Sequence, residues 1–446
     1  MIVLKFGGTS VGTAKSIKQV VDIITRINQP KIVVLSAISG TTNSLIQISN
    51  HIQNQQKDHA LLCINQLHSS YLTLIRELFN SADYKERALS FVSAKFNGIK
   101  TIIESNKTDN IDNIIVAQGE ILSTNLIQLY LEESQISSSL ISALTFMEID
   151  TNNEPKLAIL ADKLRPILAK NQSQQLWITQ GFICKNEAGE ISNLQRGGSD
   201  YTASLIGAAI QAEEIQIWTD IDGMHNNDPR YVENTFSIDE ISFDEAAELA
   251  YFGAKILHPQ SLIPAKENNI PVWLKNTFNP SSIGTIIRNK TVNNGVTAIA
   301  AKDGITAIKI KSYRMLMAYG FLKKVFEVFE KYQTPIDMIT TSEIAVSLTI
   351  DDTSNIEAIT KELKPFGKIE IDTDLSIVCV AGDFSQNKEG ISATVFNSLK
   401  DIPIRMISYG GSNYNTSLLV KTIHKTDALN SLNSGLFQEK LALQEV

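Results

Sequence analysis

The chain has 446 residues, more than one hydrophobic core usually organises, so we expect two or three domains. Hydrophobic residues make up 43% of it and charged residues 20%, a composition that excludes long disordered or low-complexity stretches. A formal net charge of −8 disfavours nonspecific attraction to nucleic acid or to an anionic membrane.

Cysteines and histidines are few and scattered. The 3 cysteines and 6 histidines have neither the pattern of a disulfide framework nor the spacing of metal ligands. We therefore predict no metal site built from protein side chains. The apolar run at the N-terminus is too short for a signal peptide, and no run approaches the ~18 residues that suggest a membrane span. We expect a cytoplasmic protein with no membrane or nucleic-acid partner.

The first part of the chain alternates short apolar strands with helices. Residues 2–4 predict a strand, residues 7–10 a glycine loop, and apolar residues from Ile17 to Ile27 recur at helical spacing. The strand pattern returns at 32–35, 176–179 and 215–218. Residues 44–110 contain no comparable strand and indicate a helical layer. This order predicts a three-layer αβα domain with a mainly parallel sheet, whose ligands bind at the carboxyl ends of the strands.

A different order of elements begins near Val296. The pattern predicts strand, helix, two strands, helix and strand in turn, at 305–312, 322–329, 336–341, 345–350, 354–365 and 368–372. This βαββαβ order is typical of a ferredoxin-like unit.

A weak internal repeat indicates a second unit of the same kind, starting near Leu375. Residues 325–326 match residues 395–396, and residues 336–339 match residues 404–407. The second copy is one strand short at its C-terminal end. A strand at 296–301, left over before the first copy, could supply it.

The loop at residues 5–10 (KFGGTS) places a cation at a strand end, two glycines behind it and a helix start beyond. Such a loop lets backbone N–H groups approach a phosphate, with Lys5 as the countercharge. It is not a Walker loop, because the G-x-x-x-x-G-K-[ST] spacing is absent. A plain strand-to-helix turn with a solvated lysine is the alternative for this pair of glycines.

The segment 195–200 (QRGGSD) leads directly into an apolar helix. Ser199 or Asp200 could be the N-cap of that helix, a role that serine and aspartate often fill. Arg196 beside two glycines and a helix start could equally grip a carboxylate, and the two interpretations are compatible.

The remaining polar motifs are each more typical of structure than of chemistry. The run 218–223 (WTDIDG) ends a strand in an Asp-Gly turn, and 242–245 (SFDE) predicts a capping box. Lys255 lies near the end of a predicted helix, where a cation is favoured without any ligand. His258 precedes a proline and has no metal-spaced partner.

Taken together and in this order, the motifs resemble the aspartate kinase family. The matching segments are 5–11, 196–200, 218–223, 243–247, 252–259 and 339–343, so that the resemblance covers essentially the whole chain. It is most similar to the monofunctional, lysine-sensitive type. The resemblance implies an amino-acid-kinase fold at residues 1–290, a first, effector-binding ACT domain at 305–374, and a second, docking ACT domain made of 296–304 plus 375–446.

The resemblance also implies roles for particular residues. Lys5 and Asp200 match the family's catalytic positions. The aspartate-binding positions are matched by Ser36, Thr42, Glu120, Arg196 and Ser199. The positions around ATP are matched by Lys5, Gly7, Gly8, Thr219, Asp220, His225, Arg230 and Lys255. Two residues depart from the family's usual pattern, since Gln195 stands where glycine is usual and His225 where many members have tyrosine.

The chemistry that the resemblance implies fits these residue types. A side-chain carboxylate is already ionised at neutral pH, so phosphoryl transfer from ATP needs no general base but must bring two anions together. Arg196 suits the substrate α-carboxylate and Glu120 its α-ammonium. Lys5 and Lys255 would offset charge on the phosphates, with Mg²⁺ held mainly by the nucleotide.

The repeat suggests which unit senses an effector. Asp337 in the first copy is matched by Arg405 in the second, so a lysine ammonium would be attracted by one and repelled by the other. We predict that the first unit binds L-lysine as an inhibitor. The expected effector residues are Met315, Phe321, Leu322, Asp337, Thr341 and Ser342. The alternative is that Asp337 is a solvated acid at a strand end. Family members with paired ACT units are usually homodimers or dimers of dimers.

Two other functions share part of this pattern. A glutamate kinase would use the same phosphate machinery but would lack the paired regulatory units and the segment 339–343. A catalytically silent amino-acid sensor would keep the fold. Lys5, Glu120, Arg196, Asp200 and Lys255 are all present, which argues against a silent relative.

Overall fold

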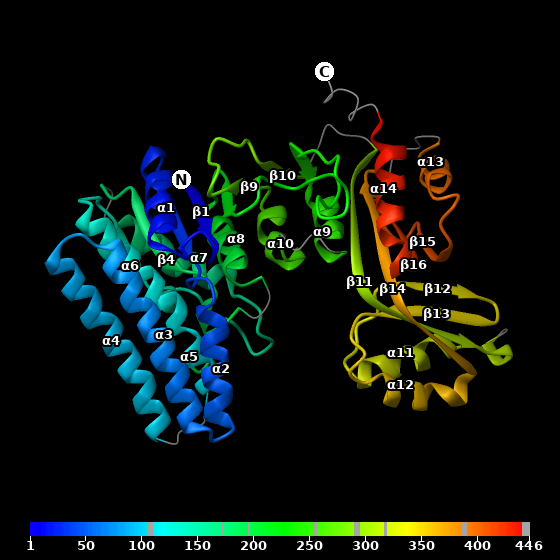
Figure 1. The fold of residues 1–446 in the computed structure, drawn as a ribbon, viewed down its shortest axis with the longest axis horizontal. Helices are drawn as coiled ribbons and strands as arrows, with labels where there is room; N and C mark the ends of the chain where they lie inside the picture. The colour runs from blue at the N-terminus through cyan, green and yellow to red at the C-terminus, as the bar shows by residue number, and fades with distance from the viewer. Residues whose placement is uncertain are drawn as a thin grey trace. The chain divides into compact units, whose positions relative to one another are not determined.

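The computed structural model describes residues 1–105, 110–170, 173–194, 197–252, 257–289, 295–315, 319–384 and 390–438. The chain forms two compact units (Figure 1). The first contains Met1–Met224, Asp239–Phe243 and Leu257–Lys290, and the second contains His225–Ile238, Asp244–Ile256 and Thr291–Val446. The segments His225–Ile238 and Asp244–Ile256 therefore belong to the second unit, although they fall inside the range 1–290 expected for one domain.

The first unit is built on an eight-stranded sheet with the strand order β3-β4-β2-β1-β7-β9-β10-β8. The strands are β1 (Ile2–Phe6), β2 (Lys31–Leu35), β3 (Ser139–Ile141), β4 (Leu176–Gln180), β7 (Ile215–Thr219), β8 (Glu240–Ser242), β9 (Val272–Asn276) and β10 (Thr285–Arg288). Only the β9–β10 pair is antiparallel among the described strands of this sheet, so the mainly parallel sheet is confirmed. The central strands β1 and β2 are almost wholly buried, as expected of parallel strands covered on both faces.

Helices cover this sheet, and the expected helical layer at 44–110 is present as three helices (Figure 1). The helices of the unit are α1 (Ala14–Arg26), α2 (Thr41–Gln53), α3 (Lys57–Leu78), α4 (Ala82–Ser105), α5 (Ile111–Val116), α6 (Gln118–Glu133), α7 (Leu157–Ala169), α8 (Gly198–Ile210) and α10 (Pro259–Glu267). A short hairpin of β5 (Ile183–Lys185) and β6 (Ile191–Asn193) precedes α8. The helical layer shares one apolar core with the sheet, in which Tyr71 and Phe96 are buried.

One described stretch, Ile111–Glu133, is long and apolar enough to cross a membrane by length and composition alone. It comprises α5 and α6, and 61% of its apolar window is buried inside the fold. Ile115, Leu122 and Leu126 belong to the core of the first unit. The apolar character of this stretch is therefore that of a core helix, which our sequence scan did not single out.

The second unit is built on a six-stranded antiparallel sheet with the order β12-β13-β11-β14-β16-β15. The strands are β11 (Val296–Lys311), β12 (Ile339–Ser342), β13 (Ala345–Ile350), β14 (Lys368–Gly382), β15 (Ile404–Tyr409) and β16 (Asn415–Lys421). Its helices are α9 (Phe243–Tyr251), α11 (Phe321–Lys331), α12 (Ile356–Leu363), α13 (Ile391–Ser398) and α14 (Lys425–Leu436). α9 starts at Phe243, which the division of the chain leaves in the first unit.

The internal repeat is visible as two separate cores on one sheet. Val325 of α11 lies in one core and Val395 of α13 lies in the other, and both side chains are buried. The segment 296–302 pairs with residues 377–382 of β14, so it supplies the missing strand of the second copy as predicted.

The strands of the two copies are continuous rather than separate. β11 runs through both copies, and so does β14, which pairs with it along most of its length (Figure 1). The pairing register shifts between Lys302 and Ile305, where Gly304 adopts a positive φ of 77°. A bulge with a glycine at this point re-aims the strand without ending it.

Candidate active site

Lys5 and Asp200 form an ion pair at the carboxyl end of β1. The Lys5 Nζ lies 2.8 Å from the Asp200 Oδ1, and the two side chains are only 11% and 17% exposed. Lys5 is registered with Val34 of β2 and Ile217 of β7, so the pair lies at the centre of the sheet. A mostly buried lysine whose ammonium is held by a carboxylate can offset the charge of an anionic ligand.

The glycine loop after β1 is packed tightly between the ends of β2 and β7. The Gly7 N–H donates to the Trp218 carbonyl at 3.2 Å, and the Gly8 carbonyl accepts from the Ser39 N–H at 3.2 Å. A Cβ on Gly8 would lie 3.0 Å from the Ala37 carbonyl oxygen. This close backbone approach favours glycine, and Lys5 is paired rather than solvated, which distinguishes the loop from a plain turn with a solvated lysine.

Glu120 is buried in the first turn of α6 and is 3% exposed. Its Oε1 accepts a hydrogen bond from the Ala37 N–H at 3.3 Å, and its Oε2 has no hydrogen-bond partner among the described residues. Burial raises the pKa of Glu120 to about 7. The close approach of α6 depends on Gly119, since a Cβ there would lie 2.9 Å from the Ala37 Cβ.

The ends of β2 and the start of α2 carry two further predicted site residues. Ser36 follows β2, its N–H donates to the Phe6 carbonyl at 3.2 Å, and its carbonyl accepts from the Ser123 hydroxyl at 2.7 Å. Thr42 is half-buried in the first turn of α2. The N-cap of that helix is Gly40, whose positive φ of 81° favours glycine.

The start of α8 brings Ser199 and Asp200 to the site. The N-cap is Gly197, with a φ of 71°, and among the described residues no side-chain hydrogen bond caps it. The prediction that Ser199 or Asp200 is the N-cap is therefore wrong, because the helix already begins at Gly198 and both residues lie in its first turn. Ser199 is buried against Gly181, where a Cβ would lie 2.4 Å from the Ser199 Cβ. Gln195 and Arg196 lie outside the described residues.

The end of β7 carries Thr219 and Asp220. The Thr219 hydroxyl donates to the Asp220 carboxylate at 3.0 Å, and Asp220 is exposed. The next acid, Asp222, accepts from the Asn276 side-chain amide at 2.7 Å, and the following Gly223 has a φ of 123°. The turn interpretation of Asp222 and Gly223 is consistent with these contacts.

His225 and Arg230 lie in the second unit. The His225 Nδ1 is 3.2 Å from the Thr235 hydroxyl. Arg230 is exposed and makes a two-pronged ion pair with Asp228, with Nε and Nη2 at 3.0 and 2.6 Å from its two oxygens. Lys255 lies outside the described residues. His258 is the N-cap of α10, as its structural interpretation requires.

Asp337 is buried and bonded, so the alternative of a solvated strand-end acid is wrong. Its side chain is 1% exposed, and its Oδ1 accepts from the Tyr251 hydroxyl at 2.8 Å and from the Lys302 ammonium at 2.9 Å. Lys302 also pairs with Asp351 at 2.8 Å. The Asp337 Oδ2 has no hydrogen-bond partner among the described residues. Neither partner could be predicted from sequence patterns, since they are 86 and 35 residues away.

The other predicted effector residues are spread over the first copy. Thr341 and Ser342 are exposed on β12, and Met315 and Phe321 pack against the core under α11. Leu322 is exposed at the start of α11. In the second copy, Arg405 pairs with Asp372 at 2.9 Å. The matched positions 337 and 405 thus carry opposite charges. Each is paired with a residue of the second compact unit.

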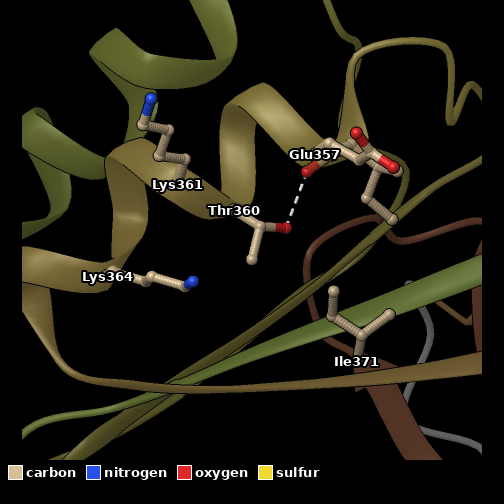
Figure 2. A pocket seen from close by; sticks show the side chains of 6 residues that line it. Glu357, Thr360, Lys361, Lys364 and Ile371 are labelled. Carbon is tan, nitrogen blue, oxygen red and sulfur yellow. Dashed lines mark hydrogen bonds between the residues drawn. The ribbon is translucent and has the colours of Figure 1, made fainter.

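An open hollow lies beside α12 (Figure 2). It has a volume of about 440 Å³ and is lined by Ile356, Glu357, Thr360, Lys361, Lys364 and Ile371. The Thr360 hydroxyl donates to the Ile356 carbonyl at 2.6 Å, so its polar group is satisfied within the helix. The predicted effector residues are not among those that line it. Within the described part of the chain, no group of three or more histidines, cysteines and acids could hold a metal ion.

The fold and the site define an enzyme domain of the amino acid kinase type joined to an ACT regulatory module. The amino acid kinase family matches residues 1–276, and the ACT domain matches residues 378–436. The amino-acid-kinase fold with ferredoxin-like ACT units, expected from the sequence, is confirmed.

Comparison with individual proteins narrows the class. Lysine-sensitive aspartokinase 3 of Escherichia coli is 33% identical over 98% of this chain and 99% of its own length, and aspartokinase 1 of Arabidopsis thaliana is 32% identical over 98% and 80%. Crystal structures of E. coli aspartokinase III with lysine and aspartate and of Clostridium acetobutylicum aspartate kinase both match with a TM-score of 0.83, at 31% and 27% identity. They cover 98% of this chain and 99% and 100% of their own. The chain belongs to the aspartokinase family.

Proposed function

We propose that the chain is an aspartate kinase, which transfers the γ-phosphoryl group of ATP to the side-chain carboxylate of L-aspartate. The products are 4-phospho-L-aspartate and ADP, and the reaction opens the biosynthesis of lysine, threonine and methionine. The observation that carries the proposal is the Lys5–Asp200 ion pair at the end of β1, on the fold of a relative, E. coli aspartokinase III, whose solved structures contain aspartate and ADP.

The proposed chemistry follows from the charges at the site. The aspartate side chain is ionised at neutral pH, so Lys5 offsets the charge on the transferring group rather than acting as a base. Asp200 orients Lys5. Glu120 pairs with the substrate α-ammonium, Arg196 grips the α-carboxylate, and Ser36, Thr42 and Ser199 complete the substrate site. ATP enters as its magnesium complex, with Gly7, Gly8, Thr219, Asp220, His225, Arg230 and Lys255 around the nucleotide.

Acyl phosphate formation, trapped as the hydroxamate, tests this function. L-aspartate or L-glutamate would be supplied with ATP and Mg²⁺, with and without L-lysine. We expect turnover of aspartate and its suppression by lysine. Turnover of glutamate would indicate the rival kinase, and no turnover of either would indicate a silent sensor.

The raised pKa of Glu120 predicts a pH-dependent Michaelis constant for aspartate. Only ionised Glu120 can pair with the α-ammonium, and its pKa in the free enzyme is about 7. The KM for aspartate should therefore rise about tenfold as the pH falls from 8 to 6, while the KM for ATP changes little. Initial rates at a series of pH values check this. A flat aspartate profile in the wild type would contradict it, and Glu120→Gln should be flat.

We further propose that residues 305–374 form the effector-binding ACT domain, whereas 296–304 plus 375–446 form the docking domain. L-lysine is the proposed inhibitor, with its ammonium at Asp337 and the rest of it near Met315, Phe321, Leu322, Thr341 and Ser342. Inhibition is then a shift toward a less active arrangement. We propose a homodimer or a dimer of dimers located in the cytoplasm.

Asp337→Asn is expected to abolish lysine inhibition and to leave turnover without lysine intact. The amide keeps an oxygen for the Tyr251 hydroxyl but removes the charge that an ammonium needs. Asp351→Asn, which removes the other carboxylate beside Lys302, is the matched control. Lysine titrations of the rate check the prediction, and retained inhibition in Asp337→Asn would sink the assignment of this residue.

A further inference from the structure

The segment His225–Ile238 is joined to the last helix, α14, by a network of buried side-chain amides. The Asn433 Oδ1 accepts from the Asn226 amide at 2.8 Å and from the Asn227 amide at 3.4 Å, and the Asn433 Nδ2 donates to the Asn234 carbonyl at 2.9 Å. All three asparagine side chains that meet here are essentially buried, with Asn226, Asn227 and Asn433 no more than 3% exposed.

The remaining polar atoms of the Asn226 and Asn227 side chains are also hydrogen-bonded. The Asn226 Oδ1 accepts from the Phe236 N–H at 2.8 Å, so that it closes the segment on itself. The Asn227 amide donates to the Leu429 carbonyl at 3.1 Å, and its Oδ1 accepts from the Asp228 N–H at 2.9 Å. A buried polar network in which every amide is bonded favours one alignment of the segment with α14. A shift of either element would leave buried amides without hydrogen-bond partners.

Apolar and cationic contacts hold the same two elements together. Val232 is buried in the core that includes Leu429 and Leu432 of α14. The rings of Phe236 and Phe437 pack edge to face, with their centroids 5.4 Å apart. On the α14 side, the Lys425 ammonium lies 3.7 Å from the centre of the Tyr231 ring and 2.7 Å from Asp303.

Arg230 lies inside the segment fixed in this way. The Tyr231 and Val232 N–H groups both donate to the Asp228 carbonyl, at 3.0 and 3.1 Å, and Arg230 is paired with the Asp228 carboxylate. The guanidinium itself is exposed, whereas the backbone on both sides of it is tied to α14. The contacts to α14 therefore fix the position of the Arg230 backbone, from which the side chain extends.

We infer that Asn433 is a positioning residue for ATP, which acts through the segment His225–Ile238 and holds Arg230 in place from the C-terminal helix. The inference rests on the proposed nucleotide role of Arg230. Asn433 is buried, so it acts on ATP only through this segment. The second ACT copy thereby has a part in the reaction that does not require an effector, since its helix α14 fixes a nucleotide-binding segment.

Asn433→Leu in the full-length protein tests this inference. Leucine has a similar size but leaves the Asn226 amide and the Asn234 carbonyl without their partner. We expect the KM for ATP to rise about tenfold while the KM for aspartate and kcat change by less than about twofold. Hydrogen exchange of the amides in 225–238 should also accelerate, with the strands of the sheet unchanged.

Two further variants keep the test decisive. Thr416→Val replaces a buried polar side chain on β16, in the same unit and outside this network, and should leave both Michaelis constants unchanged. Lys425→Met breaks the second attachment at Tyr231 and should raise the KM for ATP even if Asn433→Leu does not fold. Equal changes in both Michaelis constants, or none, would overturn the inference. If the wild type phosphorylated no aspartate, the proposed kinase function itself would be wrong. That result is distinguishable from a failure of the positioning role, which is measured on an active wild type.

Discussion

Replacing Lys5 by alanine is expected to lower kcat by on the order of 10² or more, comparable to the loss of one preorganised charge-stabilising donor. The Lys5 side chain is 11% exposed and its ammonium lies 2.8 Å from Asp200, so no mobile cation from solvent would take its place in the same geometry. The substitution also leaves Asp200 as an unpaired, mostly buried carboxylate. Steady-state rates with saturating aspartate and ATP measure the effect.

The control for Lys5→Ala is Lys15→Ala, which removes an exposed lysine from α1 and should keep wild-type activity. Thermal unfolding of both variants separates lost chemistry from lost structure. A folded Lys5→Ala protein with a rate within about tenfold of the wild type would contradict the proposed catalytic role.

Replacing Glu120 by glutamine is expected to lower kcat/KM for aspartate by on the order of 10², because it removes the buried carboxylate proposed to pair with the α-ammonium. The amide retains an oxygen for the Ala37 N–H, so the start of α6 should keep its position. The KM for ATP should stay within about twofold. Kinetics with each substrate varied in turn separate the two effects.

Stability gives an independent measurement on the same variant. The pKa of Glu120 is raised above its ordinary value, so the folded state binds the proton more tightly than the unfolded state does. The wild type should therefore lose stability as the pH rises from about 4.5 to 7, and Glu120→Gln should lack this part of the loss. Glu86→Gln, on the exposed face of α4, is the control. In the kinetic experiment, a wild-type kcat/KM for aspartate in Glu120→Gln would exclude Glu120 from the substrate site.

The arrangement of Asp337 changes how its regulatory role must be tested. A bare carboxylate at a strand end could be replaced by alanine without further effect, whereas Asp337 neutralises Lys302 and accepts from Tyr251. Alanine would remove both contacts and disturb α9 through its last residue. The asparagine variant retains the hydrogen-bond geometry, so a loss of lysine response can be assigned to charge.

The amino-acid sequence by itself determined the order and type of the elements. Strand and helix periodicity is local, so the alternating first part, the helical layer at 44–110 and the two βαββαβ copies could be predicted and are present. The glycine loop after Lys5 was also recognisable, because a close backbone approach restricts the residue type. The sequence likewise predicted a helix directly after 195–200, but the residue that caps it, Gly197, was not predicted.

Tertiary structure alone decided which side chains meet across long stretches of chain. Asp337 meets Tyr251 and Lys302, and Asn433 meets Asn226, at separations of 86, 35 and 207 residues that carry no periodic signal. It likewise decided that Glu120 has a pKa of about 7, since burial depends on what packs around α6. Residue type and spacing determine local geometry, whereas partners, burial and protonation are set by the packing of distant segments.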